Sequence, residues 1–210
     1  MSDLLNRLGY LQTRRDRTPN LDLARDLVVC DDKAGIQEIA KNMWNENKNI
    51  HGDCMNVMYE IAIIDPAIVL PYADDFIKFL SSRHQIMVQG AMFALAEIAK
   101  VKPEFIFKHL DEIKKTKEAG SGIIVDKSIS ALAHTSAAND EYSKAIFSYL
   151  LNHLSTCYFK EVPEHAERIL PAVKEINKVG FIKVLNKRID ELSGSDFTRL
   201  KKIIRITEKL

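Results

Sequence analysis

The sequence has few cysteines and no closely spaced pair of them. Its 210 residues include three, Cys30, Cys54 and Cys157, which lie far apart. An odd and widely spaced set predicts neither a disulfide framework nor a CxxC metal site. The densest group of possible ligands is His51, Asp53 and Cys54, and it lacks the second ligand pair that known zinc spacings contain. We therefore expect no metal site and no cofactor.

Long apolar runs and a large excess of charge are also absent. No run of about 18 apolar residues occurs, and the N-terminus lacks a cationic segment followed by an apolar core, so neither membrane spanning nor secretion is indicated. We expect a cytoplasmic protein. The formal net charge is only +1, which argues against a strongly electrostatic partner for the chain as a whole. With 46% apolar and 28% charged residues, the composition is that of one soluble domain.

Known catalytic motifs are missing too. The sequence contains no GxGxxG, GxxxxGK[ST], HExxH or GxSxG pattern, so the signatures of nucleotide-binding proteins, metalloproteases and serine hydrolases are absent. We therefore predict no catalytic residue, and an enzyme is the least favoured interpretation.

What the sequence does contain is an internal repeat. Glu97–Ala99 and Pro103 match Glu60–Ala62 and Pro66 thirty-seven positions earlier, in register. Thirty-seven positions later a third segment continues the frame through residues 131–133. Apolar residues of the central segment recur at steps of three and four, which predicts one face of a helix. They are Val88, Ala91, Met92, Leu95, Ile98 and Ala99.

Each repeated helix is followed by a short turn and a second apolar-periodic segment. Asp65 and Pro66 read as an N-cap and a proline in the first helical position. The unit is therefore a helical hairpin, and stacked hairpins bury a continuous core. We place hairpins at residues 20–47, 50–82, 85–117, 123–156 and 163–192, between an N-terminal cap at 1–19 and a C-terminal cap helix at 195–210.

The central unit resembles HEAT repeats and, less specifically, armadillo repeats. The resemblance lies in a proline-containing first helix, Pro66 to Leu80 with Pro71 inside it, and in a second helix of the form V-x-x-A-x-x-A-L-x-x-I-A at residues 88–99. It implies an all-α, right-handed superhelical stack of about four to five hairpins, in a single domain over residues 1–210. It also implies a non-enzymatic protein-binding scaffold or adaptor for an unidentified protein.

In HEAT-like stacks the second helices line the concave side, so their non-core positions form a ridge that a partner can bind. The thirty-seven-residue frame predicts these partner-binding positions as Asn56, Glu60, Phe93, Glu97, Lys127, Ser130 and His134. Phe93 is either an exposed interaction anchor or, after a small helix rotation, a core residue. Glu60, Glu97 and His134 occupy equivalent positions of the frame and could also act as an acid and a base in catalysis. Nothing in the sequence supplies a nucleophile or a closed pocket for such a reaction.

The alternative is a nucleic-acid-binding module related in fold to HEAT-like DNA glycosylases. From residue 174 to 210 there are ten Lys or Arg against five Asp or Glu. In this alternative, the predicted phosphate contacts are made by Lys201, Lys202 and Arg205, assisted by Arg14, Arg15 and Arg17. This sequence does not match the pattern of those enzymes, which resemble one another in having tryptophan-rich helices and a basic concave face. This chain has a single tryptophan, and Glu60 and Glu97 on its ridge would repel phosphate.

Overall fold

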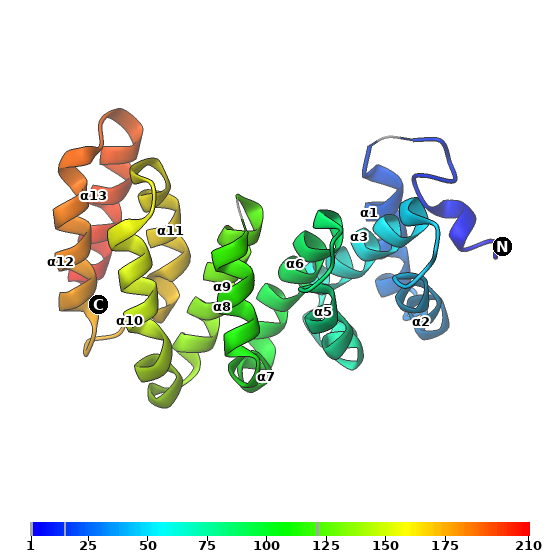
Figure 1. Cartoon of the computed structure of the whole chain (residues 1–210), viewed down its shortest axis with the longest axis horizontal. Helices are drawn as coiled ribbons and strands as arrows, with labels where there is room; N and C mark the ends of the chain where they lie inside the picture. The colour runs from blue at the N-terminus through cyan, green and yellow to red at the C-terminus, as the bar shows by residue number, and fades with distance from the viewer. Residues whose placement is uncertain (1, 15, 121) are drawn as a thin grey trace. The chain divides into compact units, whose positions relative to one another are not determined.

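The computed structural model describes residues 2–14, 16–120 and 122–210, and every regular element in these ranges is helical (Figure 1). The all-α prediction is confirmed. The chain divides into two compact units, Met1–Val101 and Lys102–Leu210. In the described part of the chain no helix is both long and apolar enough to cross a membrane.

The N-terminal unit is organised around two long helices, α3 and α6. Its elements are η1 (Leu5–Arg7), α1 (Thr18–Val29), α2 (Lys33–Asn42), α3 (Lys48–Ile64), α4 (Pro66–Val69), η2 (Leu70–Tyr72), α5 (Ala73–Phe79) and α6 (Gln85–Val101). Helix α3 packs against α1, α2 and α6, and α5 covers another side of α6 (Figure 1). The predicted apolar face of α6 lies in the core, where Met92, Leu95 and Ile98 are fully buried.

Proline shapes the first helix of the central repeat. The Asp65 carboxylate accepts a hydrogen bond from the Ala67 amide at 2.9 Å, and Pro66 occupies the first turn, as the sequence predicted. A single helix from Pro66 to Leu80 was expected, and that expectation was wrong. The segment is α4, the 3₁₀ turn η2 and α5 in succession. Pro71 has no N–H to donate and its ring clashes with the preceding turn, so the helix breaks there.

The N-terminal segment also differs from the prediction. Its leucine pattern indicated a capping helix over residues 3–11, whereas the structure has only the short 3₁₀ helix η1. The amide of Gly9 donates to the Asn20 side chain at 3.0 Å, and that of Tyr10 donates to Asp53 at 2.7 Å. These amides bond to side chains of α1 and α3, so the backbone leaves the helical path while Leu8 stays buried.

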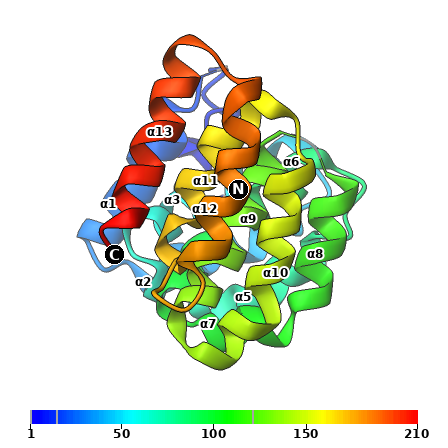
Figure 2. The same cartoon turned by 90° about the vertical axis from the view of Figure 1, so that its left-hand side faces the viewer.

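The C-terminal unit has α9 at its centre. Its elements are α7 (Pro103–Lys108), α8 (Leu110–Ala119), α9 (Ile123–Ala138), α10 (Asp140–Thr156), η3 (Phe159–Glu161), α11 (Val162–Ile169), η4 (Leu170–Ala172), α12 (Lys178–Arg188), η5 (Ile189–Glu191) and α13 (Gly194–Glu208). Helix α9 packs against α7, α8, α10 and α11. Helix α13 lies against α11 and α12, as the end-on view of this unit shows (Figure 2).

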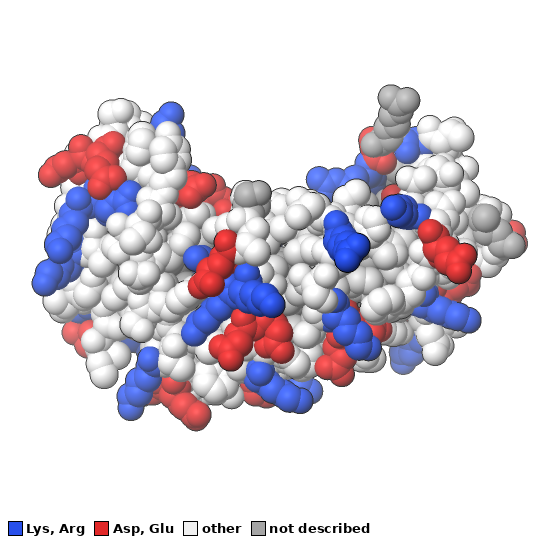
Figure 3. Space-filling model, in the orientation of Figure 1, with Lys and Arg blue, Asp and Glu red and all other residues white. Residues whose placement is uncertain are grey.

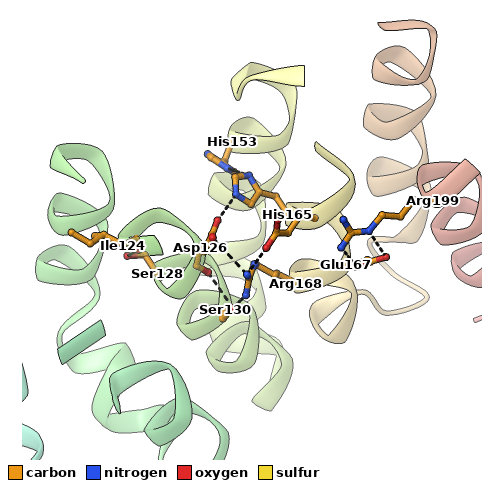
Figure 4. Close-up of polar contacts among 10 residues, drawn as sticks. Ile124, Asp126, Ser128, Ser130, His153, His165, Glu167, Arg168 and Arg199 are labelled. Carbon is orange, nitrogen blue, oxygen red and sulfur yellow. Dashed lines mark hydrogen bonds and ion pairs between the residues drawn. The ribbon is translucent and has the colours of Figure 1, made fainter. Parts of the chain in front are cut away.

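Three buried hydroxyls inside the C-terminal unit are paired locally. The hydroxyls of Ser128, Thr135 and Thr207 are fully buried, and each donates to the backbone carbonyl four residues earlier, at 2.7 to 2.9 Å. This arrangement satisfies a buried hydroxyl without a partner from another helix. Between helices, the Arg199 guanidinium of α13 binds the Glu167 carboxylate of α11, with Nε to Oε1 at 2.8 Å (Figure 4).

Candidate functional site

Helices α3 and α6 of the N-terminal unit carry the first group of predicted site residues. Asn56 and Glu60 are one turn apart on α3, and Phe93 and Glu97 are one turn apart on α6. All four side chains are partly exposed. The two helices pack against each other, so the four residues form two adjacent rows. We call these four residues the α3–α6 ridge.

A glycine allows the two helices to approach closely. A Cβ atom added to Gly90 of α6 would lie 2.3 Å from Cγ of Met55 on α3, well inside van der Waals contact. Gly90 precedes Phe93 by one turn, so the same close approach brings the Phe93 ring onto α3.

Phe93 is neither a free anchor nor a core residue. Its ring stacks on that of Tyr59, with centroids 4.8 Å apart and planes 19° apart. Tyr59 is only 3% exposed, and its hydroxyl accepts a hydrogen bond from Nη1 of Arg17 at 2.6 Å. Burial raises the pKa of Tyr59, Arg17 opposes that shift, and Glu60 adds to it. One face of Phe93 is thus fixed by Tyr59, while part of the side chain remains accessible.

The carboxylates of the ridge lie beside these rings. The effect of Glu60 on the Tyr59 pKa places its charge next to the Tyr59 hydroxyl. Glu97 forms an ion pair with Lys100 on the next turn of α6. The Glu97 side chain is 14% exposed, whereas that of Lys100 is 45% exposed. The glutamate is therefore held against the protein, and its lysine partner is the more exposed member of the pair.

A shallow pocket continues the ridge toward the N-terminal ends of α3 and α6. Its volume is about 220 Å³. It is lined by Tyr10, Arg14, Lys48, Asn49, Gly52, Asp53, Asn56 and Ile86. Ile86 is 58% exposed and contributes an apolar wall. The repeat frame singled out Asn56 but gave no sign of the pocket, because Tyr10 and Arg14 come from the N-terminal segment.

The other predicted ridge residues lie in the C-terminal unit, on α9. Lys127, Ser130 and His134 are partly exposed. The Ser130 hydroxyl donates to the carbonyl of Asp126 at 3.1 Å and accepts from Nη1 of Arg168 at 3.2 Å. Ser130 therefore belongs to a polar network that connects α9 with α11.

That network contains two buried histidines that sequence analysis did not select. His165 is 2% exposed; its Nε2 lies 2.9 Å from Oδ1 of Asp126, and its Nδ1 lies 2.9 Å from Nε2 of His153 (Figure 4). Arg168 completes the network, with Nη2 3.6 Å from Asp126 and 2.5 Å from Glu164. The hydrogen bond from His165 lowers the pKa of Asp126, and burial opposes this shift. Asp126 is therefore ionised and fixes the orientation of His165.

Cys157 adjoins the two histidines. Its Sγ atom, Nδ1 or Nε2 of His153 and a ring nitrogen of His165 all lie within 4.8 Å of one another. Burial raises the pKa of the Cys157 thiol to about 11, and burial lowers the pKa of His153 to about 3. At neutral pH the thiol is protonated and His153 is neutral, so this group is not an activated nucleophile.

The basic residues of the nucleic-acid alternative have different surroundings. Arg14 forms a bidentate pair with Asp16 at 3.0 Å, and Arg17 is bound to Tyr59. Arg15 lies outside the described residues. The basic residues near the C-terminus, Lys201, Lys202 and Arg205, are exposed on α13. On the face shown in Figure 3, Lys and Arg are interspersed with Asp and Glu over the coloured residues, and no broad surface of one sign is visible.

The fold is that of armadillo and HEAT-like helical repeat proteins. An engineered protein of known structure is 20% identical and aligns over 100% of this chain and 98% of its own, with a TM-score of 0.64. Computationally designed armadillo repeat proteins for modular peptide recognition are 13% identical over 96% and 97% of the two chains, with a TM-score of 0.67. A designed armadillo repeat protein in complex with the peptide (KR)4 is 14% identical over 99% of each chain, with a TM-score of 0.64. No family model and no curated protein matches the sequence.

Proposed function

We propose that this chain is a non-enzymatic scaffold that binds an extended, basic segment of a partner protein along the α3–α6 ridge. The observation that carries the proposal is the partly exposed side chain of Phe93, which is stacked on Tyr59 and accompanied on the ridge by Glu60 and Glu97. Such a surface provides an aromatic face and two carboxylates at defined positions. It therefore suits arginine or lysine side chains on an extended backbone.

Each part of the ridge has a matching interaction. A guanidinium stacks on the accessible part of an aromatic ring, and such contacts contribute about 0.5 to 2 kcal/mol. Carboxylates form charge-assisted hydrogen bonds with the same group. The pocket beside Asn56 has the exposed apolar wall of Ile86, which can receive an uncharged side chain of the segment. The ridge therefore favours a segment that has basic residues opposite Phe93 and the two carboxylates and an uncharged residue opposite the pocket.

The intramolecular partner of Glu97 does not prevent binding. Its pair with Lys100 spans three positions of one helix, and the lysine is 45% exposed. Ion pairs three positions apart on one helix contribute only about 0.2 to 0.5 kcal/mol. A bidentate arginine can therefore replace the lysine at little cost. The complex of a similarly folded designed protein with (KR)4 supports the same chemistry of ligand.

The test is fluorescence anisotropy with labelled (KR)4 as the probe, at low and at physiological salt. We expect saturable binding by the full chain, and a loss of at least tenfold in affinity, about 1.4 kcal/mol, for the double variant Glu60→Gln with Glu97→Gln. The matched control is Glu46→Gln with Asp74→Asn, which changes the net charge equally at two exposed positions outside the ridge. It should retain most of the affinity.

A second variant separates the aromatic contribution from charge. Phe93→Leu keeps an apolar side chain on Tyr59 but removes the π face, so we expect a several-fold loss of affinity with an unchanged melting temperature. Equal weakening by the ridge variants and by the control would show that binding is only general electrostatic attraction. Equal affinity for an acidic peptide of the same length would also contradict the proposal.

A further inference from the structure

Three side chains with metal-ligating atoms converge in the C-terminal unit. His153 and Cys157 are one turn apart at the end of α10, and His165 lies on α11. One ligand atom from each lies within 4.8 Å of the other two. We call these three residues the His–Cys–His cluster. Its members belong to different segments of the chain, so their convergence is a product of the packing of α10 against α11.

Neighbouring groups fix the direction of the ligand atoms. Asp126 is ionised and accepts a hydrogen bond from Nε2 of His165, so that nitrogen carries a proton and Nδ1 of the same ring faces Nε2 of His153 (Figure 4). In metal sites, a histidine ligand usually donates its other ring N–H to a carboxylate in this way. Asp126 comes from α9, a third helix.

The backbone at the thiol is held as well. Nη2 of Arg188 donates to the Cys157 carbonyl at 2.8 Å, and Nη1 donates to the Leu154 carbonyl at 2.9 Å. Arg188 is 9% exposed, so these bonds are shielded from water. The end of α10 is thereby fixed at a position that brings the thiol within 4.8 Å of a ring nitrogen of each histidine.

We propose that the His–Cys–His cluster binds one Zn²⁺ ion, with Nε2 of His153, Nδ1 of His165 and Sγ of Cys157 as ligands and water in the fourth position. Imidazole nitrogen and thiolate sulfur are both zinc ligands, and three protein ligands with water in the fourth position is the arrangement of open zinc sites. This inference is independent of the peptide-binding proposal, which concerns the other unit.

The required movements are small. Tetrahedral zinc with bonds of about 2.0 to 2.1 Å to nitrogen and about 2.3 Å to sulfur places the two nitrogens about 3.3 Å apart and each nitrogen about 3.6 Å from the sulfur. The nitrogens are now 2.9 Å apart, so the rings separate slightly, and the thiol turns toward them. Cys157 releases its proton to solvent. The proton between Nε2 of His153 and Nδ1 of His165 also leaves this contact, to the other nitrogen of His153 or to solvent, because both facing nitrogens must offer a lone pair to the ion. The thiolate and Asp126 together balance the charge of the ion.

The experiment uses the full chain after removal of metal with EDTA and dialysis. We expect one equivalent of Zn²⁺ by elemental analysis after equilibrium dialysis, and a rise in melting temperature with zinc. Co²⁺ in place of zinc should give a thiolate-to-cobalt charge-transfer band in the near ultraviolet. Cys157→Ser should abolish that band, and His153→Gln should weaken zinc binding at least tenfold.

Two control variants and one variant of Asp126, which orients His165, complete the design. Cys30→Ser and His84→Gln change an exposed cysteine and an exposed histidine outside the cluster, and should leave the band and the stoichiometry unchanged. Asp126→Asn should keep the band and weaken affinity about 10- to 100-fold. The proposal is overturned if metal-free protein takes up less than half an equivalent, or if Cys157→Ser retains wild-type affinity. Loss of binding in the His84 variant would instead assign the ion to the surface.

Discussion

The substitution Arg188→Met tests whether a buried guanidinium stabilises the end of α10. Arg188 donates to the carbonyls of Leu154 and Cys157 and also to Glu191. Hydrogen bonds that involve a charged group contribute about 1.5 to 3 kcal/mol each, and methionine keeps the apolar stem but replaces neither bond to a carbonyl. Two such bonds give an expected loss of about 3 to 6 kcal/mol in the free energy of unfolding.

The assay is urea denaturation followed by far-ultraviolet circular dichroism, with Arg205→Met as the matched control. Arg205 is exposed on α13 of the same unit, so its replacement should change the free energy of unfolding by about 0.5 kcal/mol or less. A cost below about 1 kcal/mol for Arg188→Met would refute the reasoning. It would mean that water satisfies both carbonyls without the guanidinium.

Three further predictions concern packing, pH and capping. Gly90→Ala should destabilise the protein by about 1 to 2 kcal/mol, because the clash with Met55 outweighs the gain in helix propensity. The control in the same urea assay is Gly52→Ala, whose added Cβ would make only an ordinary contact at 3.6 Å. Burial lowers the pKa of His51, so between its ordinary value near 6.5 and its folded value the unfolded chain binds more protons. The melting temperature should therefore fall from pH 7.5 to pH 5.5, and less steeply in His51→Gln; an unchanged slope would contradict this. Asn139→Ala removes the N-cap of α10 and should cost about 0.5 to 2 kcal/mol, whereas Asn139→Asp should cost little by the same measurement.

The repeat made the helices readable from the sequence because it combines helical periodicity with local stop and start signals. Asp65 and Pro66 fix the start of α4, through a hydrogen bond to a residue two positions away and a proline in the first turn. Such local signals can be recognised without knowledge of the tertiary structure. The failures have tertiary causes. The N-terminal leucines have helical spacing, but amides at Gly9 and Tyr10 are taken by side chains from α1 and α3. Nothing in the local sequence reports such partners.

The candidate sites show the same division. Asn56, Glu60, Phe93 and Glu97 were selected because the thirty-seven-residue frame places them at equivalent positions, and all four are partly exposed. Only the structure shows that Phe93 rests on Tyr59. The His–Cys–His cluster was missed because only part of it is local. His153 and Cys157 are four residues apart, which is a helical spacing. The third ligand, His165, comes from another helix, and the sequence gives no sign that it lies beside them.

Equivalent positions of the repeat have therefore acquired different chemistry in the two units. In the N-terminal unit, Phe93 and Glu97 of α6 flank helix α3 and leave part of their side chains accessible. In the C-terminal unit, the position equivalent to Phe93 is Ser130, whose hydroxyl accepts a hydrogen bond from Arg168 of α11. The Phe93 ring stacks on Tyr59 of a neighbouring helix and stays partly exposed, whereas the Ser130 hydroxyl, bound to a guanidinium, forms part of an internal network. The repeat frame fixes where a side chain lies on its helix, and the identity of that side chain decides which contacts the position makes.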